Sequence, residues 1–149
     1  MHTATPFLDG QLLLIDKPLK WTSFDAVNKI KWSIRKQFNI KKIKVGHAGT
    51  LDPLATGLLI VCTGKFTKKI PEIQGQVKTY TGVFTLGATT PSYDLETEVD
   101  QTFETGHITD TMIHETATQF LGETKQYPPV FSALKKDGKR MYEYARKGE

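Results

Sequence analysis

The chain has 149 residues and a mass of 16.8 kDa, a size typical of one domain that buries roughly 68–70% of its unfolded surface. Hydrophobic residues make up 38% and charged residues 24%. This composition is ordinary for a folded domain and excludes the disordered class. No apolar run approaches the ~20 residues of a membrane span, which excludes the membrane-spanning class. One cysteine excludes an internal disulfide, and the first residues show no signal-peptide pattern, so we expect a cytoplasmic protein.

Charge is distributed unevenly along the chain. The net charge is +4, but residues 1–50 carry nine basic and three acidic side chains, whereas residues 91–124 carry eight acidic and no basic ones. Residues 125–149 are again basic. Two basic segments that flank an acidic one favour a basic face for a polyanion, with an ordinary solvated surface as the alternative.

The first half of the chain predicts strands around one long helix. Residues 11–15 form an apolar run before Pro18, which indicates a buried strand ended by proline. Thr22 or Ser23 then caps a helix, because apolar residues recur after it at spacings of three and four. The resulting stripe consists of Phe24, Val27, Ile30, Ile34 and Phe38. The pattern further predicts a short basic strand over 40–45, a loop over 46–53 and a buried strand over 58–62.

The second half predicts shorter elements. We expect a short helix over 64–72 that stops near Pro71, a strand over 78–86 and a loop over 87–100. Thr109 caps a further helix that Gly122 closes, with an inward face of Met112, Ile113, Ala117, Phe120 and Leu121. Turns are expected at 127–129 and 137–138, and another helix over 141–147. This alternation implies a mixed α/β sheet in one domain.

A glycine-rich loop over residues 46–57 is the densest candidate for chemistry. It holds three glycines and Pro53 around His47 and Asp52. Glycines permit close backbone approach to a ligand, and Pro53 biases Asp52 toward an extended conformation that fixes where its carboxylate points. A carboxylate that is ionised at neutral pH can act as nucleophile or base without a metal. The alternative is a structural Asp52 that caps a turn.

This loop strongly resembles the active-site motif of the TruB family of tRNA pseudouridine synthases. Four further stretches resemble family motifs in the same order, and together they cover about residues 10–148. They are residues 10–18 with Thr22-Ser23, the strand motif Lys78-Thr79-Tyr80, Leu86-Gly87 followed by Thr90, Ser92 and Asp94, and an RNA-gripping insertion at 127–135 with 142–146.

The resemblance implies that Asp52 is the catalytic carboxylate of a uridine-to-pseudouridine isomerase and that Tyr80 stacks on the uracil. This isomerisation breaks the N-glycosidic bond and rejoins the ribose to C5 of the same uracil. A carboxylate can assist by covalent addition or by moving a ribose proton, and both routes stay open. The alternatives are an ordinary buried strand tyrosine at Tyr80 and a structural histidine at His47.

The resemblance also implies a tRNA substrate. The expected target is the T-loop uridine at position 55, in the T-arm, which must flip out of its stack. Residues expected to contact the substrate are His47, Gly49, Thr50, Leu51, Lys78 and Asp94. Residues expected at phosphates, each otherwise an ordinary solvated cation, are Lys17, Lys20, Lys42, Lys44, Lys135, Lys136, Lys139 and Arg140.

The implied fold is α+β, with a mixed, largely antiparallel sheet flanked by helices and an RNA-gripping insertion at about 124–149. In the family, the residue at Asp94 pairs with an arginine on a later strand, which would lie beyond Glu149. We therefore expect residues 1–149 to be the amino-terminal portion of a catalytic domain, truncated and inactive alone. We expect no cofactor, no membrane contact and, since the histidines show no ligand spacing, no metal. The oligomeric state is open, with a monomer expected for the full-length enzyme.

Two other classes of function stay open. Residues 46–49 match the GXXG pattern with which KH domains clamp RNA, which would make the chain a binding module without catalysis. A truncated scaffold whose exposed sheet edges bind a partner is the third possibility. One departure from the family pattern is Lys20, where glycine is usual; if that turn needs a positive φ, lysine costs roughly 1 kcal/mol.

Overall fold

The computed structural model describes residues 4–129, 131–132 and 134–145, and divides the chain into two units, residues 1–81 and 82–149. We describe each unit by itself. All strand pairings are antiparallel among the described residues, and helices accompany them in both units. The expected α+β class with a largely antiparallel sheet is therefore confirmed.

The first unit is built on a three-stranded sheet. Its strands are β1 (Leu12–Lys17), β2 (Val45–His47) and β3 (Gly57–Thr63), in the order β1-β3-β2. The register places Leu14 opposite Ile60, and Gly46 opposite Cys62. The predicted buried strand over 58–62 is confirmed, because β3 is central and Val61, Cys62 and Thr63 are fully buried.

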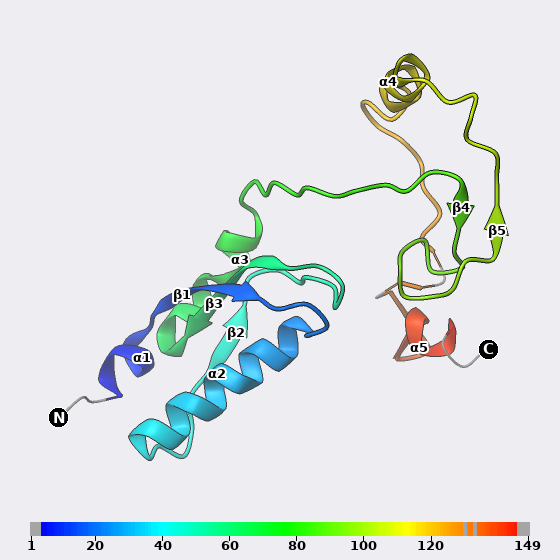
Figure 1. The fold of residues 1–149 in the computed structure, drawn as a ribbon. Coiled ribbons are helices and arrows are strands. Elements are labelled where there is room, and N and C mark those ends of the chain that lie inside the picture. The colour runs from blue at the N-terminus through cyan, green and yellow to red at the C-terminus, as the bar shows by residue number, and fades with distance from the viewer. Residues whose placement is uncertain (1–3, 130, 133, 146–149) are drawn as a thin grey trace. The chain divides into compact units, whose positions relative to one another are not determined.

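Helices cover both faces of this sheet (Figure 1). On one face, Ala26 and Val27 of α2 (Ser23–Phe38) form a core cluster with Leu59 and Val61. On the other, Cys62 packs with Ala48 and with α3 (Ile70–Gln74). The remaining elements are α1 (Thr5–Asp9) and the 3-10 helix η1 (Gly64–Lys69).

The start of α2 is fixed by a capping box. The Thr22 hydroxyl accepts a hydrogen bond from the Asp25 amide, and the Asp25 carboxylate accepts one from the Thr22 amide. The Thr22 hydroxyl also donates to the Asp25 carboxylate at 2.6 Å. This hydrogen bond and, second to it, that of the Thr22 amide lower the pKa of Asp25, and the charge of Lys17 adds to them. Of the two predicted caps, Thr22 is the one used. At the other end Asn39 adopts a left-handed conformation with φ 51°.

The second unit contains short elements. Strands β4 (Ala88–Thr89) and β5 (Gln101–Thr102) pair, as do β6 (Lys135–Lys136) and β7 (Lys139–Arg140). The β6–β7 turn has φ 51° at Asp137 and 82° at Gly138, as a two-residue type I′ hairpin requires, so the turn predicted at 137–138 is confirmed. Helices α4 (Asp110–Thr118) and α5 (Met141–Ala145) complete the unit, and residues 146–147 of the last predicted helix lie outside the described residues.

Several expectations about strands are wrong. Residues 78–86 form no strand, because an alternating pattern needs a neighbouring ladder and no described segment pairs with them. The basic strand expected over 40–45 begins only at Val45 and continues to His47. Strand β1 is half-buried rather than buried, since Leu12 and Leu14 point to the exposed side.

Three expectations about helices also need correction. Pro71 lies in the first turn of α3, where its missing N–H is harmless, so it starts a helix rather than stopping one. Phe24 is exposed, and Ala26 takes its place in the core. Thr109 does cap α4, but the face expected to be inward is exposed throughout, because no described residue of its unit covers it.

Candidate functional site

The loop between β2 and β3 presents Asp52. The two strands are antiparallel neighbours, so residues 48–56 form the connection at one end of the sheet. Gly49 has φ +131° and Gly57 φ +105°, a region that residues with a Cβ rarely adopt. The two glycines therefore let the loop backbone adopt a conformation that would be strained with any other residue at these positions.

Ser23 anchors this loop to the first turn of α2. Its hydroxyl donates to the Leu51 carbonyl oxygen at 3.1 Å, and the Leu51 amide donates back to the hydroxyl at 2.9 Å. Ser23 is only 3% exposed. Both backbone groups of the residue before Asp52 are thus held by one buried side chain.

A second anchor lies on the other side of Asp52. The Lys20 amide donates to the Pro53 carbonyl oxygen at 2.7 Å. Lys20 has φ 66°, so the turn does use the left-handed conformation in which lysine carries a strain. Asp52 is therefore flanked by two residues, Leu51 and Pro53, that are each bonded to residues 20–23.

The turn that carries Lys20 is itself held by Lys17. This side chain is fully buried, and its ammonium donates to the carbonyl oxygens of Pro18 at 3.0 Å and Trp21 at 2.5 Å. The sequence suggested Lys17 as a phosphate contact. The structure corrects this assignment, because the ammonium faces its own main chain and supports the loop instead.

The Asp52 carboxylate faces solvent. The residue is exposed, and its main-chain carbonyl accepts a hydrogen bond from the Ala55 amide at 3.0 Å. Among the described residues the carboxylate itself has no hydrogen bond or ion pair. Because a capping aspartate would bond its side chain to a nearby amide, the structure disfavours the purely structural alternative.

His47 points back along the loop. Its Nδ1 lies 2.5 Å from the Gly49 carbonyl oxygen. A carbonyl only accepts, so Nδ1 carries the proton, and in the neutral ring Nε2 is left as an acceptor. The half-buried ring therefore helps to fix the Gly49 turn and keeps one nitrogen for a ligand.

Lys78 reaches the same turn from the end of α3. Its Cε lies 3.8 Å from the position that a Cβ on Gly49 would occupy. The Lys78 ammonium donates to the carbonyl oxygens of Gln74 at 2.6 Å and Gln76 at 2.9 Å. The structure thus brings His47, Gly49, Leu51 and Lys78 together around Asp52's loop, with Thr50 exposed within it.

The other predicted site residues lie in other segments of the chain. Tyr80 is 69% exposed and makes no hydrogen bond or ring contact with the described residues. Asp94 lies in the second unit, where its carboxylate accepts from the Glu96 amide at 2.9 Å. Lys135 lies in β6 of that unit. Among the described residues, no group of three or more histidine, cysteine, aspartate or glutamate side chains could hold a metal ion.

The geometry also bears on the KH alternative. A KH loop joins two helices, whereas Gly46 and His47 belong to β2 and are paired with Cys62 and Val61 of β3. The GXXG pattern here is the end of a strand, and a KH module is excluded on that ground. Nor has any helix in the described ranges the length and apolar character to cross a bilayer.

The sequence did not reveal the two anchors. Ser23 and Leu51 are 28 positions apart, and the Thr-Ser pair is fully accounted for as a helix cap. The one signal available was Lys20 at a place where the related motif has glycine. It indicated a strained turn at Lys20, but not that this turn binds the carbonyl oxygen of Pro53.

Comparison with known proteins defines the family. The model of the TruB family pseudouridylate synthase, N-terminal domain, matches residues 35–149, which include the Asp52 loop. A protein named tRNA pseudouridine synthase B from Flavobacterium johnsoniae is 68% identical over 148 residues, which is 99% of this chain and 65% of that protein. Proteins of the same name from Phocaeicola vulgatus and Bacteroides thetaiotaomicron are 59% and 57% identical over 143 residues, 61% and 60% of their own lengths.

The chain therefore belongs to the TruB family of pseudouridylate synthases. It spans 60–65% of the length of these three relatives.

Proposed function

We propose that the protein carrying this chain converts uridine to pseudouridine in the T-loop of tRNA, at position 55, with Asp52 as its catalytic carboxylate. The observation that carries the proposal is the Asp52 loop. Its carboxylate is exposed and has no partner in the part of the chain that the structure describes, and it lies between two residues fixed by Ser23 and Lys20. Family membership supplies the reaction class. As the chain spans only part of its relatives, the activity is proposed for the whole protein.

The Asp52 carboxylate has two routes to the product. The uridine is flipped out of its stack to reach the loop. The carboxylate then either adds covalently to the nucleoside or moves a ribose proton, and this change is reversed before release. In both routes the C1′–N1 bond breaks, a bond forms between C1′ and C5 of the same uracil, C5 loses its proton and N1 gains one. Both routes need a carboxylate held in place and open to the ligand, which the two anchors and the exposure of Asp52 provide.

The neighbouring residues have supporting roles in this proposal. His47 offers Nε2 to the RNA next to the flipped nucleotide. Tyr80, exposed beyond α3, is available to stack on the uracil when the RNA binds. The basic hairpin β6–β7 grips the phosphate backbone from the second unit, as part of an RNA-binding insertion at about 124–149.

A tRNA transcript tests both the reaction and its target. The complete protein is incubated with the transcript, and pseudouridine is quantified by nucleoside chromatography and located by carbodiimide-primer extension. We expect one pseudouridine, at position 55, and none in a transcript with cytidine at that position. Product at another site would contradict the T-loop assignment, and no product in any tRNA would contradict the proposed reaction.

A further inference from the structure

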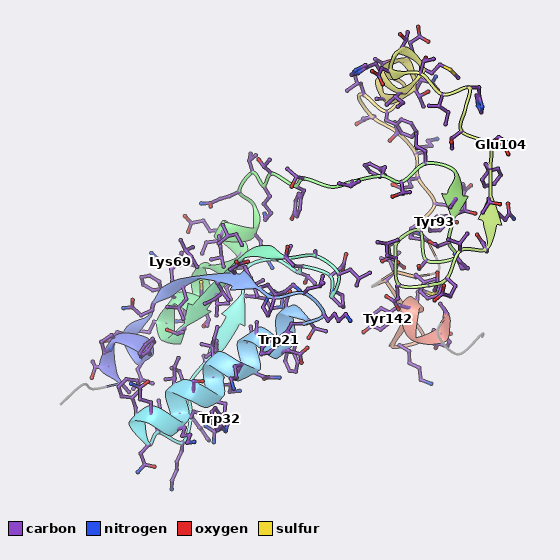
Figure 2. The ribbon with its side chains drawn as sticks, viewed as in Figure 1. Trp21, Trp32, Lys69, Tyr93, Glu104 and Tyr142 are labelled. Carbon is purple, nitrogen blue, oxygen red and sulfur yellow. The ribbon has the colours of Figure 1, made fainter. Side chains whose placement is uncertain are left out.

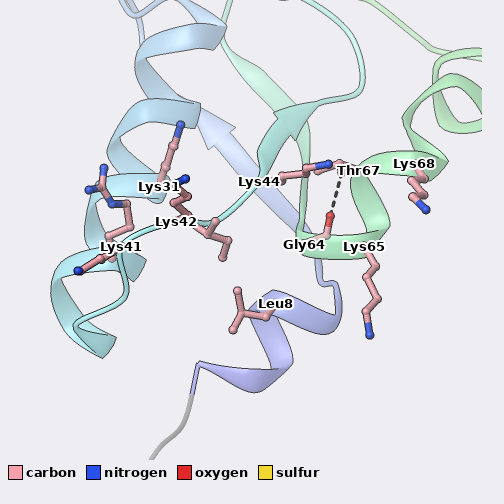
Figure 3. Close-up of a pocket in the computed structure, with 11 residues that line it drawn as sticks. Leu8, Lys31, Lys41, Lys42, Lys44, Gly64, Lys65, Thr67 and Lys68 are labelled. Carbon is pink, nitrogen blue, oxygen red and sulfur yellow. Dashed lines mark hydrogen bonds between the residues drawn. The ribbon is translucent and has the colours of Figure 1, made fainter.

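A basic cavity lies in the first unit, away from the Asp52 loop. It has a volume of about 640 Å³ and lies between α2, residues 41–44, α1 and η1. Figure 3 shows Leu8 of α1 pointing into the space between α2 and η1. Ile43 and Leu8 give it an apolar floor, while most of its rim is cationic.

Among the described residues, the rim carries seven cations and no carboxylate. One of them, Lys65, is paired with Asp9 at 2.8 Å. The other six have no ion pair within the part of the chain that the structure describes. They are Lys31, Arg35, Lys41, Lys42, Lys44 and Lys68.

The backbone around this cavity is held tightly. Gly64 has φ +52°, and a Cβ there would lie 2.1 Å from the Leu8 carbonyl oxygen. The Gly64 amide donates to the Lys44 carbonyl oxygen at 2.8 Å, and the buried Thr63 hydroxyl donates to the Phe7 carbonyl oxygen at 2.8 Å. Three segments distant in sequence are thus fixed around the cavity, so its cations are gathered by the fold and not by chance side-chain positions.

Gathered like charges repel one another, and a bound anion removes that repulsion. A single small anion would not engage cations spread over α2, residues 41–44 and η1. A chain of phosphates separated by sugars matches a rim of several cations around an apolar floor. The chemistry therefore favours a polyanion with regularly spaced phosphates.

The cavity and the Asp52 loop are at opposite ends of α2. Leu51 is anchored at Ser23, the first residue of the helix, whereas Lys31 and Arg35 of the cavity lie in its second half. With a rise of 1.5 Å per residue, Ser23 and Arg35 are about 18 Å apart along the axis. An RNA that places a nucleotide at Asp52 must extend over several nucleotides to reach the cavity.

We propose that this cavity is a second binding site for the ribose-phosphate backbone of the RNA substrate, remote from the nucleotide that reaches Asp52. The proposal rests on the proposed function only for the identity of the RNA. It assigns the cavity cations to substrate affinity, and none of them to the chemical step. Because phosphates are contacted without reading bases, the site is indifferent to sequence.

The test compares two variants of the same helix. The cavity variant is Lys31→Gln/Arg35→Gln. The control is Lys29→Gln/Lys36→Gln, which removes two exposed charges of α2 whose ammonium groups lie 5.3 Å and 4.8 Å from the Trp32 ring centroid. Figure 2 shows where Trp32 lies on this helix. The dissociation constant of the complete protein for tRNA is measured over a range of salt concentrations, and again for a minimal stem-loop containing only the target loop.

We expect the cavity variant to bind tRNA about tenfold more weakly at low salt and to lower the slope of log K against log salt by about one for each lost contact. The control should change neither, and the stem-loop should bind all three proteins alike. Equal losses in both variants, an equal loss with the stem-loop, or no loss at all would each overturn the proposal.

Two checks keep the result independent of folding and of the proposed reaction. Lys42→Gln, at an exposed position of the 41–44 segment, is a second variant. It should weaken tRNA binding by less than the double variant, because it removes one charge instead of two, and should leave stem-loop binding unchanged. Binding is measured without turnover, so a wild-type protein that binds tRNA through the cavity but makes no pseudouridine would contradict the proposed function and not this site. Tight binding of inorganic phosphate or a free nucleotide with unchanged tRNA affinity in the cavity variant would overturn the assignment to RNA.

Discussion

Replacing Ser23 with alanine removes the anchor between α2 and the residue before Asp52. The change deletes one hydroxyl that makes two hydrogen bonds, to the Leu51 carbonyl oxygen and from the Leu51 amide. Both Leu51 groups then lose their protein partner in a partly buried position. An unsatisfied buried group costs about 1–3 kcal/mol, and partial access to water lowers that figure, so we expect a loss of about 2 kcal/mol in the free energy of unfolding.

Ser23→Ala should also lower activity, because it affects the position of Asp52 as well as the stability of the protein. A released Leu51 lets the next residue, Asp52, leave its productive place, and small misplacements of a catalytic group cost up to about 10²-fold in rate. We expect pseudouridine formation by the complete protein at saturating tRNA to fall at least about tenfold, while tRNA affinity stays near that of the wild type. Single-turnover assays and filter binding measure these two quantities separately.

Ser33→Ala is the matched control, because Ser33 is an exposed residue of the same helix. Alanine has the higher helix propensity there, so stability should stay level or rise by a few tenths of a kcal/mol. Urea unfolding measures both variants. A Ser23→Ala protein that is as stable and as active as Ser33→Ala would refute the anchoring role.

Three further outcomes follow from single groups in the first unit. Lys20→Gly should raise the free energy of unfolding by about 0.5–1 kcal/mol, because glycine relieves the left-handed strain and only part of that gain is offset by the greater freedom of glycine in the unfolded chain. The control Lys36→Gly, within α2, should instead lower the free energy of unfolding by about 1 kcal/mol. A lower free energy of unfolding in both variants would contradict the strain at Lys20. Since the Thr22 hydrogen bonds lower the pKa of Asp25, its stabilisation is present above the ordinary pKa of 3.8 and is lost as the pH falls through the lower folded value. Urea unfolding between about pH 5 and pH 2 should show this loss in the wild type and a smaller one in Asp25→Asn, and identical curves would contradict it. Burial raises the pKa of the Cys62 thiol, so iodoacetamide should label the native protein far more slowly than the urea-unfolded one, and equal rates would contradict its burial.

The sequence predicts this fold best where the pattern is local. The cap at Thr22, the apolar run of β3 and the Asp-Gly turn of the second hairpin each depend on a few adjacent residues, and each is confirmed. The strand expected over 78–86 is wrong because alternation describes a face that could be buried, whereas a strand exists only where another segment supplies the ladder.

The candidate site follows the same division. Asp52 and the glycines around it were identified from the sequence, because their residue types and spacing lie within one loop. The contacts of Ser23 and Lys20 with the Asp52 loop could not be, since they join segments about 30 residues apart. A lysine in the sequence gives no sign of whether its ammonium faces solvent or, as at Lys17, its own carbonyl oxygens.

The role of the Asp52 carboxylate is tested most directly by measuring pseudouridine formation by the complete protein with Asp52→Asn. Asparagine keeps the size and shape of the side chain but removes its negative charge. Asp16→Asn, an exposed carboxylate at the end of β1, is the control for the loss of one charge. We expect no detectable pseudouridine from Asp52→Asn with tRNA affinity preserved, and full activity from Asp16→Asn. Wild-type product from the Asp52→Asn protein would contradict this role.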